Sequence, residues 1–355
     1  MKTVVPPVAT NDATPAWLRR FTKLVAFLTL FLIFAGAMVT STGSGLSVPD
    51  WPTTYGTNMF TFPFSKWVGG IFFEHGHRLI AATVGFLTVI QAIWLQLREP
   101  KRFLRRLGWC SLGAVIAQGV LGGLTVIFLL PHAISIAHAG LAEIFLCLNV
   151  SIAFFASDTY GMLRRLEKGD APVGASMGLV ALVYGQILIG ALMRHLGAGL
   201  AIPDFPTSFG VIVPHFTSAA IAVNFAHRAG AVVVAIAVIA MFIRTLRFEL
   251  KHPLRTFATF LLYVVMMQIT LGAYTVWTGK HPVVTSLHVV GGALTLTLSL
   301  LLALTARTVG WRVSPRASAR GLDGRAAHES SDLAPPAAPG ASLTVGVTIA
   351  SEVTA

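Results

Sequence analysis

A short string of ionisable residues, Glu-His-Gly-His-Arg at 74–78, opens an apolar run that stays uncharged from Leu79 to Leu97. Ionisable side chains inside a membrane-spanning helix cost free energy, so they usually serve a function and face a partner. A related string, Asn-Phe-Ala-His-Arg at 224–228, opens a second apolar run. Both strings hold a histidine and an arginine, but only the first has a glutamate, Glu74. This asymmetry predicts two similar binding sites, of which only one can do acid–base chemistry.

Two more histidines complete two matched pairs, His77 with His138 and His227 with His288, and a constant offset of 150 residues relates the pairs. Each histidine lies roughly five to ten residues inside its apolar run, so the members of a pair share a similar depth at about 1.5 Å per residue. Two imidazoles facing each other across a helix bundle suit bis-histidine ligation of haem iron. Zinc or copper fits less well, because no cysteine, aspartate or further histidine recurs with the pairs.

Three polar side chains flank these histidines. Arg78 and Arg228 directly follow the first histidine of each pair, and a guanidinium can bind a haem propionate with two parallel hydrogen bonds. The alternative is that both arginines extend to the lipid headgroups. Glu74 precedes His77 by three positions, a helical rotation of about 300°. The two side chains therefore point within about 60° of each other, so Glu74 should face the same cavity. Its counterpart, Asn224, can form hydrogen bonds but cannot relay a proton.

The apolar fraction of 55% and the charged fraction of 11% indicate a membrane protein. A span needs about 20 apolar residues. Eight runs qualify, at 21–42, 69–96, 107–130, 133–157, 174–194, 217–243, 255–278 and 283–306. Only two cysteines occur, at 110 and 147, and neither reaches an outer loop, so no disulfide is expected.

Lys and Arg are concentrated in alternate loops. Twelve lie between spans two and three, four and five, and six and seven, whereas the other loops hold three. By the positive-inside rule, both termini are cytoplasmic. The net charge of +12 is therefore a signal of topology, and no nucleic-acid partner is expected.

An internal repeat divides the chain. Residues 36–56 and 190–210 are identical at ten of 21 positions, and both contain Gly-x-Gly-Leu-x-x-Pro-Asp-x-Pro-Thr. Each half holds four spans, an even number, so both halves enter the membrane from the same side. The sequence therefore predicts an all-α integral membrane protein, with eight transmembrane helices arranged as two parallel four-helix bundles related by a pseudo-two-fold axis.

The predicted parts follow from this repeat. They are an N-terminal cytoplasmic arm (1–20), an N-terminal half (21–157), a cytoplasmic linker (158–173), a C-terminal half (174–306) and a disordered cytoplasmic tail (307–355). The loops at 43–68 and 195–216 are expected to fold over the outer mouths of the bundles. The roles of His75, Glu143 and the two Pro-Asp-x-Pro segments stay open.

From about residue 20 to 306, the chain resembles the haem A synthase family. The resemblance rests on Glu-x-x-His-Arg in span two, single histidines in spans four, six and eight, and the loop string Thr-Gly-Ser-Gly-Leu-Ser-Val-Pro-Asp-Trp-Pro. Members of that family oxidise the C8 methyl of haem O to the formyl of haem A for terminal oxidases. The resemblance implies that the enzyme is an oxidoreductase of the cell membrane.

Carried over to this chain, the resemblance places substrate haem O in the N-terminal half, between His77 and His138, with Glu74 catalytic. It places a resident haem b in the C-terminal half, with His227 and His288 as iron ligands. Haem O and haem A are the implied partners within the lipid bilayer. Haem O synthase, terminal-oxidase assembly factors and an unidentified electron acceptor are further candidates.

One departure from the family concerns cysteine. Many bacterial members carry a cysteine pair in the first outer loop, and this sequence has none, so no mechanism that needs the pair can operate here. Two other classes of protein remain open from the residues alone. A bis-haem b-type electron-transfer subunit that oxidises quinol explains the four histidines but not the single Glu74. A haem or metabolite transporter would use the same parallel repeat.

Overall fold

A computed structural model describes residues 14–165 and 171–310, and within these ranges the regular structure is helical. Eight of its helices are long and apolar enough to cross a membrane. They are α1 (Ala16–Ser41), α2 (Gly70–Arg98), α3 (Arg102–Ile127), α4 (His132–Ala156), α6 (Val173–His195), α7 (Ala219–Thr245), α8 (Pro253–Trp277) and α9 (Pro282–Val309). The all-α fold class and the eight predicted spans are confirmed.

Helices α1 and α3 each begin five residues before the predicted apolar runs, because a helix can carry charged residues beyond its membrane-spanning part. Helix α1 starts at Ala16, and Arg19 in its first turns pairs with Asp158. Asp158 is the first residue of the short helix α5 (Asp158–Leu163), which lies in the segment predicted as a linker. The Ser157 hydroxyl caps this helix by accepting from the backbone N–H of Tyr160. Residues 1–13 of the predicted arm (1–20) and 311–355 of the predicted tail (307–355) lie outside the described residues, whereas 16–20 belong to α1 and 307–309 to α9.

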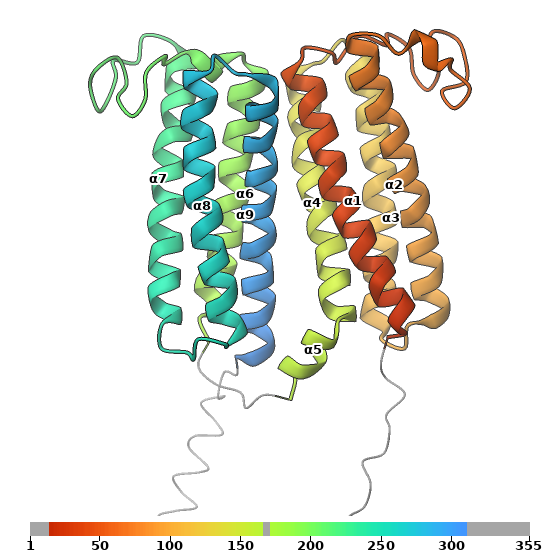
Figure 1. Ribbon diagram of the computed structural model, residues 1–355, viewed down its shortest axis with the longest axis vertical. Coiled ribbons are helices and arrows are strands. Elements are labelled where there is room, and N and C mark those ends of the chain that lie inside the picture. Colours follow the sequence, from red (N-terminus) through yellow and green to blue (C-terminus); the bar gives the residue numbers. More distant parts are fainter. Residues whose placement is uncertain (1–13, 166–170, 311–355) are drawn as a thin grey trace, which may run out of the picture. The chain divides into compact units, whose positions relative to one another are not determined.

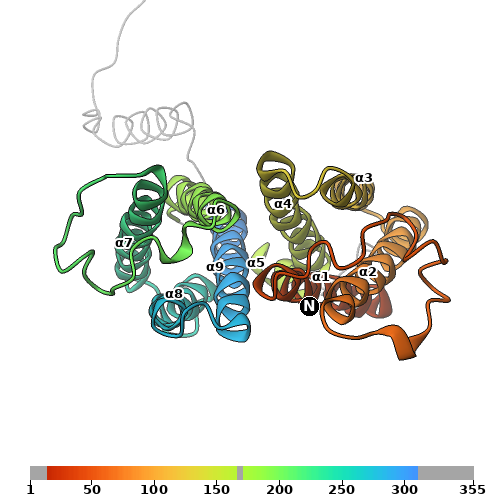
Figure 2. The same cartoon turned by 90° about the horizontal axis from the view of Figure 1, so that it is seen from above.

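The eight long helices form two closed rings of four. Helix α1 packs on α2, α2 on α3, α3 on α4 and α4 on α1, and α6 to α9 repeat this order (Figure 1). Figure 2 views both rings along the helix axes. Helices α1 and α4 also pack on α9, and α4 packs on α6. Two four-helix groups therefore meet along α1, α4, α6 and α9, whereas a pseudo-two-fold axis between them stays a prediction.

Polar contacts join the two groups near the loops at 42–69 and 196–218, which define the loop-bearing end of the molecule. Arg194, in the last turn of α6, donates to the carbonyl oxygen of Ala37, 2.8 Å away, and to the hydroxyl of Ser41, 2.7 Å away. The Ser286 hydroxyl of α9 lies 3.0 Å from the same Ser41 hydroxyl. Arg194 therefore links α6 to α1.

Four buried polar side chains, one from each helix of the first ring, meet toward the opposite end. The Asn149 carbonyl oxygen accepts from Gln91, at 2.8 Å, and from Ser111, at 3.0 Å. Its amide nitrogen donates to Thr29, at 3.3 Å. At the matching positions of the second ring, the sequence has Val183, Met241, Leu261 and Ser299. We call Thr29, Gln91, Ser111 and Asn149 the polar cluster.

Removing the central member of the polar cluster should destabilise the first ring. Asn149→Ala leaves Gln91 and Ser111 without their shared acceptor, and hydrogen bonds between membrane helices contribute about 0.6 kcal/mol each, rising to about 1.7. We expect the free energy of unfolding in detergent to fall by about 1–3 kcal/mol. Ser299→Ala is the matched control, since the Ser299 hydroxyl donates only to Thr295 of its own helix. Equal effects of the two variants would contradict this role.

Candidate functional site

Each of the four predicted histidines faces a glycine on the preceding long helix. A Cβ atom placed on any of these glycines would lie 2.9 to 3.2 Å from the ring carbon Cε1 of its histidine. The pairs are Gly36–His77, Gly122–His138, Gly190–His227 and Gly272–His288. At such distances an added methyl group would press on the ring, which would have to shift by a few tenths of an ångström, and the tightest fit is at Gly190. The sequence reading missed these glycines, although two of them open the repeated segments.

In the second ring, the two imidazoles lie opposite each other. The ring centroids of His227 and His288 are 6.3 Å apart, and the ring planes are 79° apart. Metal–imidazole bonds of about 2 Å place two imidazoles on either side of one metal ion at a centroid separation of roughly 6 Å. His288 Nδ1 lies 3.1 Å from the backbone oxygen of Gln268 and can donate to it. That bond leaves Nε2 of His288 free to act as a ligand.

In the first ring, His77 and His138 lie near enough for the charge of one to act on the other. The Nδ1 atom of His77 is buried and has no hydrogen-bond partner among the described residues, whereas Nδ1 of His227 lies 3.1 Å from the side-chain nitrogen of Gln186. The structure therefore brings each predicted pair together within one ring, but the imidazoles of the two rings have different surroundings.

Glu74 is buried, with 4% of its surface exposed, at the loop-bearing end of α2. One carboxylate oxygen accepts from Arg78 at 2.7 Å, and the other accepts from the backbone N–H of Val48 at 2.8 Å. Among the described residues, no hydrogen bond joins Glu74 to a histidine. Asn224, its counterpart in α7, donates instead to the backbone oxygens of Ala198 and Gly199. The asymmetry noted in the sequence thus extends to the contacts.

The two predicted propionate partners hold the loops. Arg78 donates to the backbone oxygens of Val48, Asp50 and Thr53, at 2.7 to 3.1 Å. Arg228 donates to the matching oxygens of Ile202, Asp204 and Thr207, at 2.7 to 3.0 Å. These backbone contacts explain why an arginine stands at both positions. Binding of a propionate by either arginine stays a prediction.

The two aspartates of the Pro-Asp-x-Pro segments organise their loops. Asp50 accepts from the Thr53 hydroxyl at 2.5 Å and from the backbone N–H groups of Tyr55 and Gly56 at 2.7 and 2.8 Å. Burial raises the pKa of Asp50, but these hydrogen bonds outweigh it and lower the pKa to about 2. Asp204 has the same contacts, and the Thr207 hydroxyl and the Gly210 and Phe209 amides hold its pKa below the usual range. Neither carboxylate needs a catalytic role to explain its presence.

Loss of the Asp50 carboxylate should loosen the first loop. Asp50→Ala removes the acceptor of three donors, so we expect a protease to cleave 42–69 several times faster, with 196–218 unchanged. Asp204→Ala is the matched control, with the opposite pattern.

The same loop should respond to pH. Because the pKa of folded Asp50 is depressed, the stabilisation that Asp50 gives to the loop is complete above the unfolded pKa of about 3.9. It is lost as the pH falls toward 2, so cleavage of 42–69 by pepsin should rise over that range in the wild type and in Asp204→Ala but not in Asp50→Ala. Indifference of this loop to Asp50→Ala would contradict its role.

The first loop packs onto the helix ends. Gly123 of α3 has no side chain because the Trp51 ring occupies that space, 2.5 Å from where a Cβ would lie. His75, fully buried, points to the same loop, since its Nδ1 is 3.1 Å from the Thr54 hydroxyl and its ring packs against Trp67. Glu143 is buried in α4, and its Oε2 atom has no partner among the described residues.

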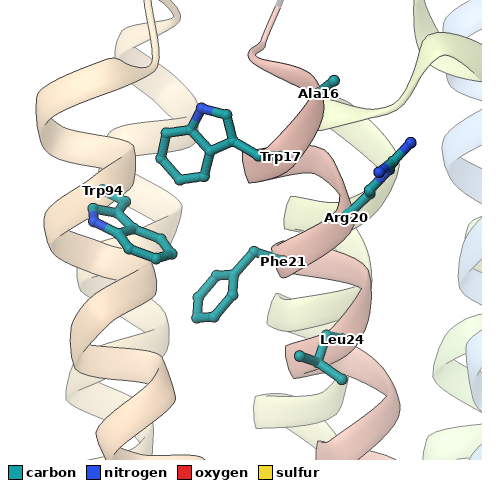
Figure 3. A pocket seen from close by; sticks show the side chains of 6 residues that line it. All are labelled: Ala16, Trp17, Arg20, Phe21, Leu24 and Trp94. Atoms are coloured by element: carbon teal, nitrogen blue, oxygen red, sulfur yellow. The ribbon is translucent and has the colours of Figure 1, made fainter.

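An open apolar groove lies where the first turns of α1 meet the last turns of α2 (Figure 3). Trp17 and Phe21 of α1 contact the Trp94 ring of α2, each with centroids 4.8 Å apart. Ala16, Arg20 and Leu24 complete the lining. Tryptophans beside arginines are typical of the membrane–water interface. This groove therefore marks an interface and holds none of the candidate site residues.

These observations define an all-helical, multi-pass membrane protein with a histidine pair in each of two four-helix rings. Residues 19–300 match the family described as "Cytochrome oxidase assembly protein" (COX15-CtaA), and the chain belongs to this family.

Curated relatives carry the name "Heme A synthase". The protein of Shouchella clausii is 30% identical over 280 residues, which cover 74% of this chain and 87% of the relative. That of Symbiobacterium thermophilum is 28% identical over 254 residues, with coverages of 69% and 80%. That of Halalkalibacterium halodurans is 28% identical over 282 residues, with coverages of 76% and 91%.

Proposed function

We propose that the chain is a haem A synthase that oxidises the C8 methyl group of haem O to a formyl group. The names of the curated relatives and the membership of a cytochrome oxidase assembly family support this proposal. The observation that carries the assignment of the reaction is the asymmetry between the rings. A carboxylate, Glu74, lies one helical turn from His77, whereas an amide, Asn224, stands at the same place near His227.

The first ring is the proposed substrate site, with His77 and His138 on either side of the haem O iron. Oxidation of a methyl to a formyl group removes four electrons, adds one oxygen atom and releases protons. Glu74 would accept these protons or stabilise positive charge that develops on the substrate. Its bonds to Arg78 and to the Val48 N–H fix the carboxylate at the mouth of the ring.

The second ring is the proposed site of a resident haem b, with His227 and His288 as ligands. The centroid separation of 6.3 Å and the nearly perpendicular rings fit two imidazoles that share one iron. Gly190 and Gly272 give both imidazoles room beside the helix backbone. A haem bound there would supply an electron-transfer centre, and the chain's own part is to hold and orient the two ligands.

The membrane is the proposed plasma membrane, with both termini in the cytoplasm and the loop-bearing end outside. The lysines and arginines of alternate loops support this orientation. The histidines then lie in the outer half of the bilayer. Haem O synthase and terminal-oxidase assembly factors remain the proposed protein partners.

Conversion in cells tests the proposed function. The chain is co-expressed with a haem O source in a host that makes no haem A, and the extracted haems are separated by chromatography. We expect haem A to appear only when the chain is present. Haem O that persists unchanged beside abundant membrane-inserted protein would contradict the proposal and favour an electron-transfer subunit.

A further inference from the structure

Two glutamines, Gln186 and Gln268, contact candidate ligands in the second ring, and only Gln186 has no glutamine at the matching position of the first. The side-chain nitrogen of Gln186, in α6, lies 2.7 Å from the backbone oxygen of His227 and 3.1 Å from its Nδ1. Its amide oxygen, Oε1, is buried and has no partner among the described residues. Gln186 therefore holds the His227 segment, with its amide nitrogen beside the imidazole and Oε1 pointing to Gly230.

Gly230 makes room for this glutamine. A Cβ atom on Gly230 would lie 2.1 Å from Oε1 of Gln186, a distance that no side chain could tolerate without displacing the amide. Gly230 stands three residues after His227, and Gln186 stands four residues before Gly190. Gln186 of α6 therefore fits against Gly230 of α7, because the glycine leaves the space that the amide occupies.

The first ring lacks both members of this pair. Leu32 stands four residues before Gly36, and Ile80 stands three residues after His77. A leucine cannot form the hydrogen bond, and the branched side chain of Ile80 occupies the position that is a glycine in the second ring. In agreement, the Nδ1 atom of His77 is buried without a hydrogen-bond partner in the described part of the chain.

A partner on the second ring nitrogen matters for a metal-bound histidine. Ligation through Nε2 leaves the proton on Nδ1, and a group that accepts this proton fixes the ring and makes the imidazole a stronger ligand. Gln186 is the side chain that the structure places beside Nδ1 of His227, at 3.1 Å, and its bond to the His227 backbone oxygen fixes the helix segment that carries the ring. His77 has no comparable side chain at the matching position.

We propose that Gln186, admitted by Gly230, positions His227 so that the second ring retains its haem, whereas Leu32 and Ile80 leave the haem of the first ring free to exchange. This inference rests on the proposed function, in which one haem is resident and the other is substrate and product. A substrate site must release what it binds, and a weaker ligand makes release faster. Gln186 is thus a positioning residue that acts through His227.

The first test compares haem dissociation from purified holoprotein, measured as transfer to excess apomyoglobin. Gln186→Leu, which copies the first ring, should raise the dissociation rate of the resident haem about 10- to 100-fold. Gln96→Leu is the control, because Gln96 also lies on a long helix but, among the described residues, hydrogen-bonds to Trp109 and to neither histidine pair. A wild-type rate and an unchanged low-spin electron paramagnetic resonance spectrum in Gln186→Leu would overturn the proposal.

The reverse exchange tests the other ring. Leu32→Gln combined with Ile80→Gly should slow haem dissociation from the first ring, and Leu32→Gln alone should not, because Ile80 blocks the amide. Equal rates in the double variant and the wild type would count against the inference.

A second variant, Gln186→Glu, tests the proposal if Gln186→Leu does not fold, because it keeps a polar side chain of the same length. It should retain the haem and lower its midpoint potential, because a carboxylate draws the Nδ1 proton more strongly than an amide does. An unchanged potential would contradict the positioning role. His227→Ala separates this result from a failure of the proposed function, since full haem retention in that variant would refute the assignment of the second ring itself.

Discussion

Glu74→Gln is expected to lower the yield of haem A by at least about 100-fold, the lower range for loss of a group that transfers protons. Haem O or a hydroxylated product should accumulate, while the resident haem b stays at the wild-type level. Glutamine keeps the size of the side chain but removes the charge that pairs with Arg78 and the capacity to accept a proton. The measurement is chromatography of haems extracted from cells that co-express a haem O source.

The loop contact of Glu74 calls for a control, because the same carboxylate accepts from the Val48 N–H. Protease cleavage of 42–69 reports on that contact. Loss of haem A in Glu74→Gln, with cleavage of 42–69 unchanged, would support a chemical role. Glu74→Asp should keep part of the activity because it keeps the charge. Formation of haem A at the wild-type rate by Glu74→Gln would show that the carboxylate is not catalytic.

His227→Ala and His288→Ala are each expected to remove most of the resident haem b. The purified wild type should show a low-spin b-type spectrum, which requires two strong axial ligands, and each variant removes one of them. His77→Ala should remove less, since its ring holds the exchangeable haem. The absorbance spectrum and the haem content per chain measure the effect. Full haem b in both C-terminal variants would refute the assignment of the two rings.

The sequence predicted the helices well, because an apolar run of about 20 residues has few alternatives to a membrane span. It placed the start of α1 too late, because Arg19 and Arg20 lie outside the apolar run yet continue the helix. The pairing of His227 with His288 was also predictable, since it followed from two runs with histidines at equal depth.

The contacts of the polar residues could not be predicted in the same way. The sequence suggested propionates for Arg78, but the three backbone oxygens that it contacts belong to a loop whose path depends on Asp50. The polar cluster was missed because its four members lie on four helices and none has a polar neighbour in the sequence that would signal it. Gln186 was missed for a related reason, since the predicted sites rest on residues that recur in both halves, and Gln186 does not recur.

The number and kind of haems in the purified wild-type protein test the central claim most directly. After co-expression with a haem O source, the protein should contain haem b together with haem O or haem A, at up to one of each kind per chain. This composition follows if one ring retains its haem and the other converts its own. Two haem b per chain, with no haem O or haem A bound or released, would contradict the account and identify an electron-transfer subunit.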